Sequence, residues 1–305
     1  MRVAHISDLH VLAMDGVGAA RFVNKRFTGL LNLKLKREHA HKRAHLAALL
    51  EAIRGGAFDH VIVTGDLTNL ALESEFEAVR AMLDAGLGMP SSAITVVPGN
   101  HDLYTRGAMK TRRFTSYFEP FIKSDLPELS RNMDLGPFPF VRLRGPLAIV
   151  GLTTAVPRPP LVAAGVVGAE QREALSIILD HPEVKKRGLV LCMHHPLHPP
   201  ARPHKALMEG LHDAHLMRSL LSNTRGLVLH GHLHRRMQTP IEGSPITSVG
   251  ATSASLEHTD PHRMAGFNVY DFDRTTGALT SMSAEVLMSD GKSTENRAIP
   301  VAHWH

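Results

Sequence analysis

Short runs of apolar, often β-branched residues alternate along the chain with longer segments of helical periodicity. Such runs predict buried strands, and apolar residues three and four positions apart predict helices that pack on a sheet. The predicted strands are 3–7, 60–64, 94–97, 147–152, 188–193 and 226–230, and the predicted helices are 38–53, 71–85, 169–180 and 210–222. Strand-like runs near 246–250, 266–272 and 278–286 follow. This order predicts an α/β fold with helices covering central strands.

The composition is that of a globular chain and excludes several classes of protein. Of the 305 residues, 43% are hydrophobic and 21% are charged, which argues against disorder. No apolar run reaches the roughly 20 residues that a membrane-spanning helix needs. The single cysteine, Cys192, excludes a disulfide framework within one chain. Because the chain begins without an apolar leader, we expect a cytoplasmic protein.

The net charge of +5 is concentrated in one segment. Residues 21–43 hold eight lysines and arginines against Glu38, so they carry +7 and the rest of the chain carries −2. Apolar residues are interleaved with these cations at helical spacing: Phe27, Leu30, Leu31 and Leu35. We interpret about 16–43 as a basic amphipathic insertion. It is either a structural arm, a substrate lid or a contact with anionic lipid at a membrane surface.

Metal-binding residue types follow five predicted strands at the point where each strand ends. These motifs are Asp8-Leu9-His10, Gly65-Asp66, Gly99-Asn100-His101-Asp102, His194-His195-Pro196 and Gly231-His232-Leu233-His234. In open α/β sheets, ligands bind beyond the carboxyl ends of the strands, so we expect these side chains to meet at one sheet edge. Residues two apart in a strand share a face, which would pair Asp8 with His10 and His232 with His234.

The residue types favour a centre with two metal ions. Carboxylate oxygens together with imidazoles suit Mn²⁺, iron or Zn²⁺ better than Ca²⁺ or Cu⁺. Seven candidate ligands are too many for one tetrahedral ion. They suit two ions roughly 3.5–4 Å apart that share a bridging carboxylate, an arrangement used for in-line attack at phosphorus.

In their order along the chain, the five motifs resemble those of the calcineurin-like metallophosphoesterases. The pattern of that family is D-x-H, G-D-x-x, G-N-H-D/E, H and G-H-x-H, and every block is present between Asp8 and His234. The resemblance implies a four-layer α/β/β/α sandwich of two mixed β-sheets flanked by helices. It also implies one metallophosphoesterase domain over residues 1–305, strand-rich from about 240, with two divalent cofactors (Mn²⁺, Fe²⁺ or Fe³⁺, or Zn²⁺).

The resemblance also assigns a role to each residue of the motifs. The implied ligands are Asp8, His10 and His234 for the first metal, Asn100, His194 and His232 for the second, and Asp66 as the bridge between them. His101 corresponds to the family's histidine that faces the substrate and stabilises or protonates the leaving oxygen. A metal-bridging hydroxide would be the nucleophile.

Three neighbouring residues have two interpretations each. His195 either lines the pocket behind His194 or is a loop residue hydrogen-bonded to the backbone. His230 is expected to pack beside the ligands or to support one of them, rather than to act as an eighth ligand. Asp102 either orients a neighbouring residue or caps a helix.

The resemblance implies hydrolysis of a phosphate ester. The Asn-His and His-His-Pro contexts resemble bacterial class III cyclic-nucleotide and glycerophosphodiester phosphodiesterases, so our first interpretation is a cyclic-nucleotide-type phosphodiesterase acting on a small anionic diester. The alternative is a lipid pyrophosphatase at the membrane surface, similar to enzymes that cleave UDP-2,3-diacylglucosamine, which the basic insertion favours. A non-specific phosphoesterase or nuclease comes third, because a nucleic-acid partner needs a broader basic surface. A scaffold without activity is disfavoured, since no ligand position is lost.

Overall fold

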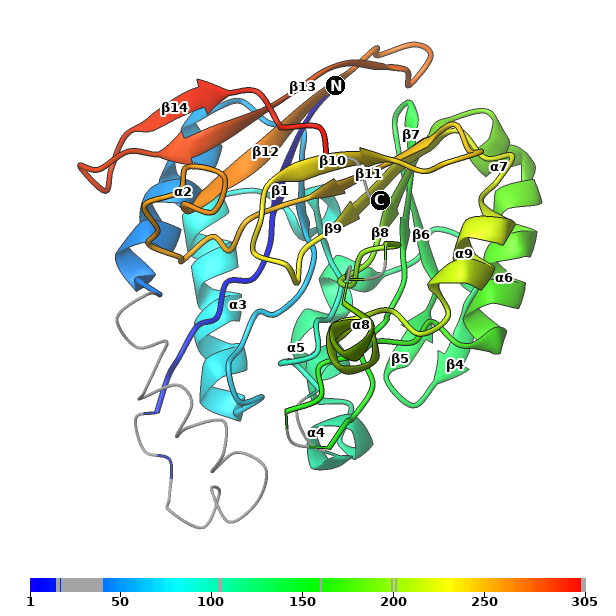
Figure 1. The fold of residues 1–305 in the computed structure, drawn as a ribbon, viewed down its shortest axis with the longest axis horizontal. Coiled ribbons are helices and arrows are strands. Elements are labelled where there is room, and N and C mark those ends of the chain that lie inside the picture. The colour runs from blue at the N-terminus through cyan, green and yellow to red at the C-terminus, as the bar shows by residue number, and fades with distance from the viewer. Residues whose placement is uncertain are drawn as a thin grey trace.

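The computed structural model describes residues 1–14, 17, 41–103, 106–159, 161–198, 200 and 202–302. The basic insertion predicted at about 16–43 lies outside the described residues, apart from Val17 and residues 41–43. In the described part, two six-stranded sheets lie next to each other, with α2 and α3 on one side and α6, α7 and α9 on the other (Figure 1). The expected four-layer α/β/β/α sandwich is therefore confirmed.

The first sheet has the strand order β14-β13-β12-β1-β2-β3. Its strands are β1 (Arg2–Ile6), β2 (His60–Val63), β3 (Ile94–Val96), β12 (Gly266–Phe272), β13 (Leu279–Leu287) and β14 (Thr294–Arg297). The strands β1, β2 and β3 are parallel, and the three C-terminal strands extend the sheet in antiparallel pairs from β1.

The second sheet has the strand order β10-β11-β9-β8-β7-β6. Its strands are β6 (Phe140–Arg144), β7 (Leu147–Gly151), β8 (Gly188–Cys192), β9 (Gly226–His230), β10 (Met237–Pro240) and β11 (Ile246–Gly250). The four inner strands are parallel, whereas β6 and β10 pair antiparallel at the two edges. A short hairpin joins β4 (Arg131–Met133) to β5 (Gly136–Phe138).

The helices divide between the two sheets. Those beside the first sheet are α2 (Arg43–Gly55), α3 (Glu73–Leu87) and α5 (Arg113–Ile122), and those beside the second are α6 (Ala169–Asp180), α7 (Pro182–Lys185) and α9 (Ala214–Leu220). Short helices α4 (Arg106–Lys110) and α8 (Pro203–Glu209) lie in the loops beyond the strands, and single 3₁₀ turns cover Ser91–Ala93 and Pro127–Leu129.

Successive residues of β8 face two different apolar cores. Val190 and Cys192 pack in the cluster that also holds β1, β2, α2 and α3. Leu189 and Leu191 pack in the cluster formed with α6 and α9. Because side chains alternate along a strand, one face of the second sheet packs on the first sheet and the other is covered by helices. The carboxyl ends of the inner strands of both sheets are thereby brought together.

The predicted strands are all present, with bounds that shift by at most one residue at either end. The helix predicted at 210–222 is present but shorter, because Gly210 takes an extended conformation that ends α8, and α9 covers only Ala214–Leu220. The helix α5 was missed because Pro120 interrupts its pattern. The strand β6 was missed because Arg142 lies in it, buried and bonded to the carbonyl of Ile94.

A buried carboxylate at the start of α3 holds the preceding loop. Glu75 Oε2 accepts hydrogen bonds from the backbone N–H groups of Leu70 and Leu72 at 2.9 and 3.0 Å. Burial raises the pKa of Glu75 to about 7, against the lowering effect of those donors. Since the folded state then holds the proton more tightly than the unfolded chain, Glu75 contributes stability below pH 4.5 that is lost as the pH rises through about 7.

We expect Glu75→Gln to flatten the pH dependence of the free energy of unfolding between about pH 4.5 and 8. The amide oxygen can still accept from Leu70 and Leu72, whereas the ionisation cost, roughly 3 kcal/mol at most, disappears. Urea unfolding at a series of pH values measures this. Glu51→Gln, an exposed change on α2, is the control, and an unchanged slope in Glu75→Gln would contradict the assignment.

Candidate metal centre

The candidate ligands meet where the two sheets adjoin. Asp8, Asp66 and Asn100 follow β1, β2 and β3 of the first sheet, and His194 and His232 follow β8 and β9 of the second. The expectation of a single sheet edge was therefore wrong, because the motifs are divided between two sheets. The backbone N–H of His232 donates to the Asp8 carboxylate at 3.1 Å, which joins the two halves of the site.

Five of the seven candidate ligands have a left-handed backbone: Asp8, His10, Asp66, His232 and His234, with φ between 47° and 68°. They lie in the turns directly after the strands. The alternation of side chains along a strand was our reason for pairing Asp8 with His10 and His232 with His234, and that reason was wrong. Such a conformation costs a non-glycine residue of the order of 1–3 kcal/mol and persists where the surroundings determine it. Backbone bonds from Asp8 to Gly65 and from His10 to Asp66 do so here.

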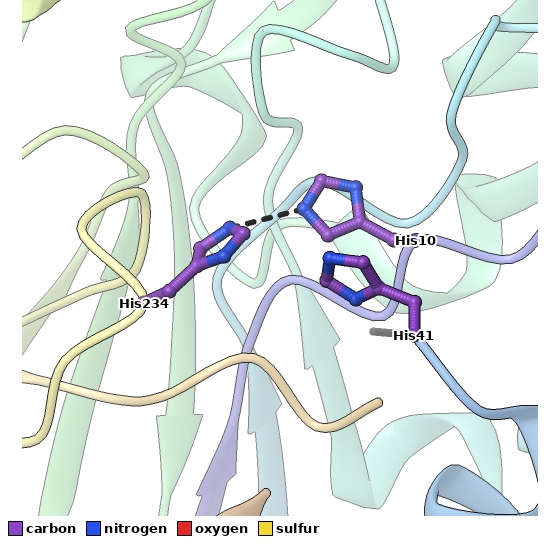
Figure 2. A group of neighbouring side chains, drawn as sticks. All are labelled: His10, His41 and His234. Carbon is purple, nitrogen blue, oxygen red and sulfur yellow. Dashed lines mark hydrogen bonds between the residues drawn. The ribbon is translucent and has the colours of Figure 1, made fainter. Parts of the chain in front are cut away.

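One group of side chains gathers around His234. Its Nε2 lies 3.1 Å from Asp8 Oδ1 and 3.0 Å from His10 Nε2. The ring of His41 lies next to that of His10, with the two ring centroids 4.8 Å apart (Figure 2). One ligand atom of each of the three histidines lies within 4.8 Å of the others. The sequence analysis missed His41, which belongs to none of the five motifs.

A second group gathers around His194. Its Nε2 lies 3.3 Å from Asp66 Oδ2 and 3.1 Å from Asn100 Oδ1. Its Nδ1 donates to the carbonyl of Thr64 at 2.7 Å, which leaves the Nε2 lone pair directed at two oxygen acceptors. Three acceptor atoms that face one another need a cation between them, either a proton on Nε2 or a metal ion.

The donor separations in both groups fit bound metal ions. Two donors that each lie about 2.1 Å from one ion are about 3.0 Å apart at a right angle and about 3.4 Å apart at the tetrahedral angle. The pairs Asp8–His234, His10–His234, Asp66–His194 and Asn100–His194 are separated by 3.0 to 3.3 Å. His232 can also act as a metal ligand. Its Nε2 donates to the carbonyl of Glu209 at 2.9 Å, which leaves the lone pair of Nδ1 to bind an ion.

The electrostatics of the cluster are set by two buried carboxylates. Asp8 and Asp66 are 0% and 2% exposed. Burial would raise the pKa of Asp66, but the imidazoles of His194, His101 and His10 hold it well below its usual range. Burial would likewise lower the pKa of His194, yet the Asp66 carboxylate raises it to about 9. The site thus attracts positive charge, which protons or metal ions can supply.

His101 lies beside the Asp66 carboxylate. Its backbone N–H donates to Asp66 Oδ1 at 2.8 Å, and its ring Nδ1 donates to the carbonyl of Asn69 at 2.8 Å. The carbonyl of Asn69 only accepts, so Nδ1 carries a proton and Nε2 is the atom that can gain or lose one. Asn69 in turn donates from Nδ2 to the carbonyl of His10 at 2.6 Å.

The other three predicted site residues lie behind the ligands. Asp102 accepts from the backbone N–H groups of Leu67, Thr68 and Gly99, and thereby ties together the loops that carry Asp66 and Asn100. Both ring nitrogens of His195 are engaged, with the Thr154 hydroxyl and the Ala163 carbonyl, each at 2.7 Å. His230 is buried, and its Nδ1 contacts the carbonyl of Gly231.

Two glycines of the motifs leave room for the carboxylates. A Cβ atom at Gly99 would clash with the backbone nitrogen and carboxylate of Asp66. A Cβ atom at Gly231 would clash with the hydroxyl of Ser7 and the carboxylate of Asp8. The sequence predicted these positions only as parts of motifs, and the structure gives the reason: the backbone of one loop lies directly against the carboxylate of another.

The sandwich and the group of carboxylates, imidazoles and an amide between its sheets define a metal-dependent phosphoester hydrolase. The chain belongs to the calcineurin-like phosphoesterase family, whose model matches residues 1–236. The members of this family bind two divalent metal ions, and the His and Asp groups described above are candidate ligands.

Solved structures show the same fold at low sequence identity. A dimetal phosphatase from Danio rerio matches with a TM-score of 0.57 and 13% identity over 98% of both chains. A purple acid phosphatase from seeds of yellow lupin (Lupinus luteus) matches with a TM-score of 0.58 and 14% identity over 98% of this chain. This chain covers 53% of the lupin protein. No curated protein sequence matches the chain. Among the described residues, no helix is long and apolar enough to cross a membrane.

We expect Gly231→Ala and Gly99→Ala each to weaken metal binding by at least tenfold, because the added methyl group displaces a carboxylate by more than ligand geometry tolerates. Titration of the metal-free protein with Zn²⁺ measures the affinity. Gly55→Ala is the matched control, because a Cβ there meets nothing within 4 Å. Affinities equal to those of the unaltered protein would contradict the close approach.

Proposed function

We propose that this chain is a dinuclear metal-dependent phosphodiester hydrolase that acts on small anionic diesters of the cyclic-nucleotide type. One observation carries the proposal. Asp66 Oδ2 lies 3.3 Å from His194 Nε2 and 4.0 Å from His10 Nε2, so a single carboxylate oxygen faces both ligand groups. This is the position that a bridging carboxylate needs between two ions.

The proposed ligands follow from the two groups. Asp8, His10 and His234 would hold the first ion, Asn100, His194 and His232 would hold the second, and Asp66 would serve both. When bound, two Mn²⁺, iron or Zn²⁺ ions supply hydroxide near neutral pH and stabilise charge on the phosphate oxygens. The residues of the chain fix the positions of these donors and exclude bulk water from the buried carboxylates.

His101 is the proposed proton donor to the leaving oxygen. Its Nδ1 proton is held by the carbonyl of Asn69, so the ring orientation is fixed and Nε2 carries the proton that is transferred. Its backbone N–H is bound to Asp66, which keeps the ring next to the proposed bridge. A positioned imidazole of this kind contributes roughly 10²–10⁴-fold to the rate.

The sequence contexts of two ligand motifs support a diester as the substrate. Asn100-His101 and His194-His195-Pro196 resemble the corresponding motifs of bacterial cyclic-nucleotide and glycerophosphodiester phosphodiesterases. This resemblance favours a small, monoanionic diester over a phosphomonoester.

An acylated nucleotide diphosphate is the second candidate substrate, and one observation favours it. Leu161 and Leu207 are 80% and 65% exposed. Their segments are joined by the hydrogen bond from Ala163 N to the Met208 carbonyl, and the next residue, Glu209, binds His232. Large exposed leucines next to a ligand loop would suit the acyl chains of a substrate such as UDP-2,3-diacylglucosamine, or the membrane surface that contains it.

A substrate panel distinguishes these candidates. Protein loaded with Mn²⁺ is tested with cyclic AMP, a glycerophosphodiester, UDP-2,3-diacylglucosamine and a phosphomonoester. We expect the highest kcat/KM for a soluble diester. A preference for the acylated substrate would support the second candidate, and a preference for the monoester would overturn the proposed diester specificity. The Asp66→Ala protein, purified in parallel, shows how much of each rate comes from contaminating hydrolases.

Asp66→Ala should lose both metal ions, because one carboxylate serves both groups. Asn100→Ala should weaken mainly the binding of one ion, because Asn100 contacts His194 of the second group. Elemental analysis of the dialysed variants measures the metal content. The control Asp84→Ala removes an exposed carboxylate on α3 that pairs with Arg80. Two ions retained by Asp66→Ala would contradict its role as the bridge.

His101→Ala should keep both metal ions while kcat falls by roughly 10²–10⁴. If His101 protonates the leaving oxygen, the loss should be much smaller for a substrate with a good leaving group such as nitrophenolate, which departs without a proton. Rates on a nitrophenyl diester and an alkyl diester test this. Equal losses on both would show that the ring positions the substrate instead.

A further inference from the structure

His41 extends the first ligand group by a third imidazole. Its ring centroid lies 4.8 Å from that of His10 and 5.7 Å from that of His234, and both contacts are edge-on, at 66° and 85°. Figure 2 shows the three rings around a common space, with His41 below His10 and His234 across from both. One ligand atom from each ring lies within 4.8 Å of the others.

The backbone holds His41 in this place. His41 forms an antiparallel bridge with Leu256, and the N–H of Lys42 donates to the carbonyl of Ser255 at 2.7 Å. The same segment fixes Asp8, because the Ser253 hydroxyl donates to the Asp8 carbonyl at 2.6 Å. The 253–256 segment thus positions His41 and Asp8 relative to one another.

The hydrogen bond of the His41 ring is that of a metal-bound histidine. Its Nδ1 lies 2.7 Å from the Ser255 hydroxyl oxygen. A histidine that binds a metal through one ring nitrogen commonly donates the other N–H to an oxygen acceptor, which fixes the tautomer. With Nδ1 directed at Ser255, Nε2 is the ring nitrogen of His41 that faces His10 and His234 (Figure 2).

We propose that His41 is a further protein ligand of the metal ion held by Asp8, His10 and His234; this rests on the proposed dinuclear site. Donors on opposite sides of one ion are about 4.2 Å apart. Because one ligand atom of each ring lies within 4.8 Å of the others, a small shift of the rings would bring all three into coordination distance. Three imidazoles make this ion's donor set richer in nitrogen than the other's, which favours Zn²⁺ over Mn²⁺.

The experiment compares metal binding by the unaltered protein and by His41→Ala. Each metal-free protein is titrated with Zn²⁺ and with Co²⁺, and the stoichiometry, the two dissociation constants and the visible absorption of bound Co²⁺ are recorded. We expect His41→Ala to bind one ion at least tenfold more weakly, with a changed Co²⁺ spectrum, and to bind the other ion as before. Unchanged constants and spectra would overturn the proposal.

Two further variants make the result specific. His41→Glu offers an oxygen ligand at the same place, so it should recover part of the affinity and shift the preference of that ion from Zn²⁺ toward Mn²⁺. The control His215→Ala removes an exposed histidine on α9 and should match the unaltered protein. Equal weakening by His215→Ala would show that loss of any histidine, rather than loss of a ligand, is responsible.

The outcome for His41 can be separated from that for the proposed function. If the unaltered protein binds fewer than two ions, the dinuclear site itself is wrong. If it binds two, and His41→Ala also binds two with the same affinities but with a raised KM, then His41 contacts substrate and only the ligand proposal fails.

Discussion

The burial of two carboxylates between two sheets is the constraint on which the site depends. Asp8 and Asp66 are almost fully buried, and each buried ion loses several kcal/mol of hydration unless other groups replace it. Backbone N–H groups of His232 and His101 replace part of that hydration, and the imidazoles around them supply positive charge. Two divalent cations would complete the compensation in place of protons, which would link metal binding, protonation and folding at this centre.

The geometry of the loops does not depend on the metals alone. Asp102 is buried beneath the ligands and binds the backbone on both sides, which fixes the distance between the Gly65-Asp66 and Gly99-Asn100 turns. Burial and the nearby Asp66 carboxylate raise its own pKa to about 7. These contacts, together with those of Glu75 to the next loop, offset the free-energy cost of the left-handed backbone at the ligand residues. They thereby hold the donor atoms in place before any ion binds.

The sequence predicted most of the fold because its inner strands are short apolar runs bounded by polar motifs. It could not predict β6 or α5, since buried Arg142 and Pro120 contradict the local pattern and are accommodated only by tertiary contacts. The grouping of the motif residues followed from the resemblance, but the reason based on strand alternation was wrong. The turns after the strands are left-handed, which a polar motif does not reveal.

His41 could not be predicted from any motif, because it comes to the site through pairing with residue 256, far away in the sequence. That pairing has a wider consequence. The 253–256 segment follows the second sheet, binds the carbonyl of Asp8 at the end of β1 and holds the residue before α2. The centre therefore lies where both sheets and the start of a helix meet. A cation held by the proposed ligands would join all three, and would therefore stabilise the assembled sandwich over any state in which the two sheets have separated.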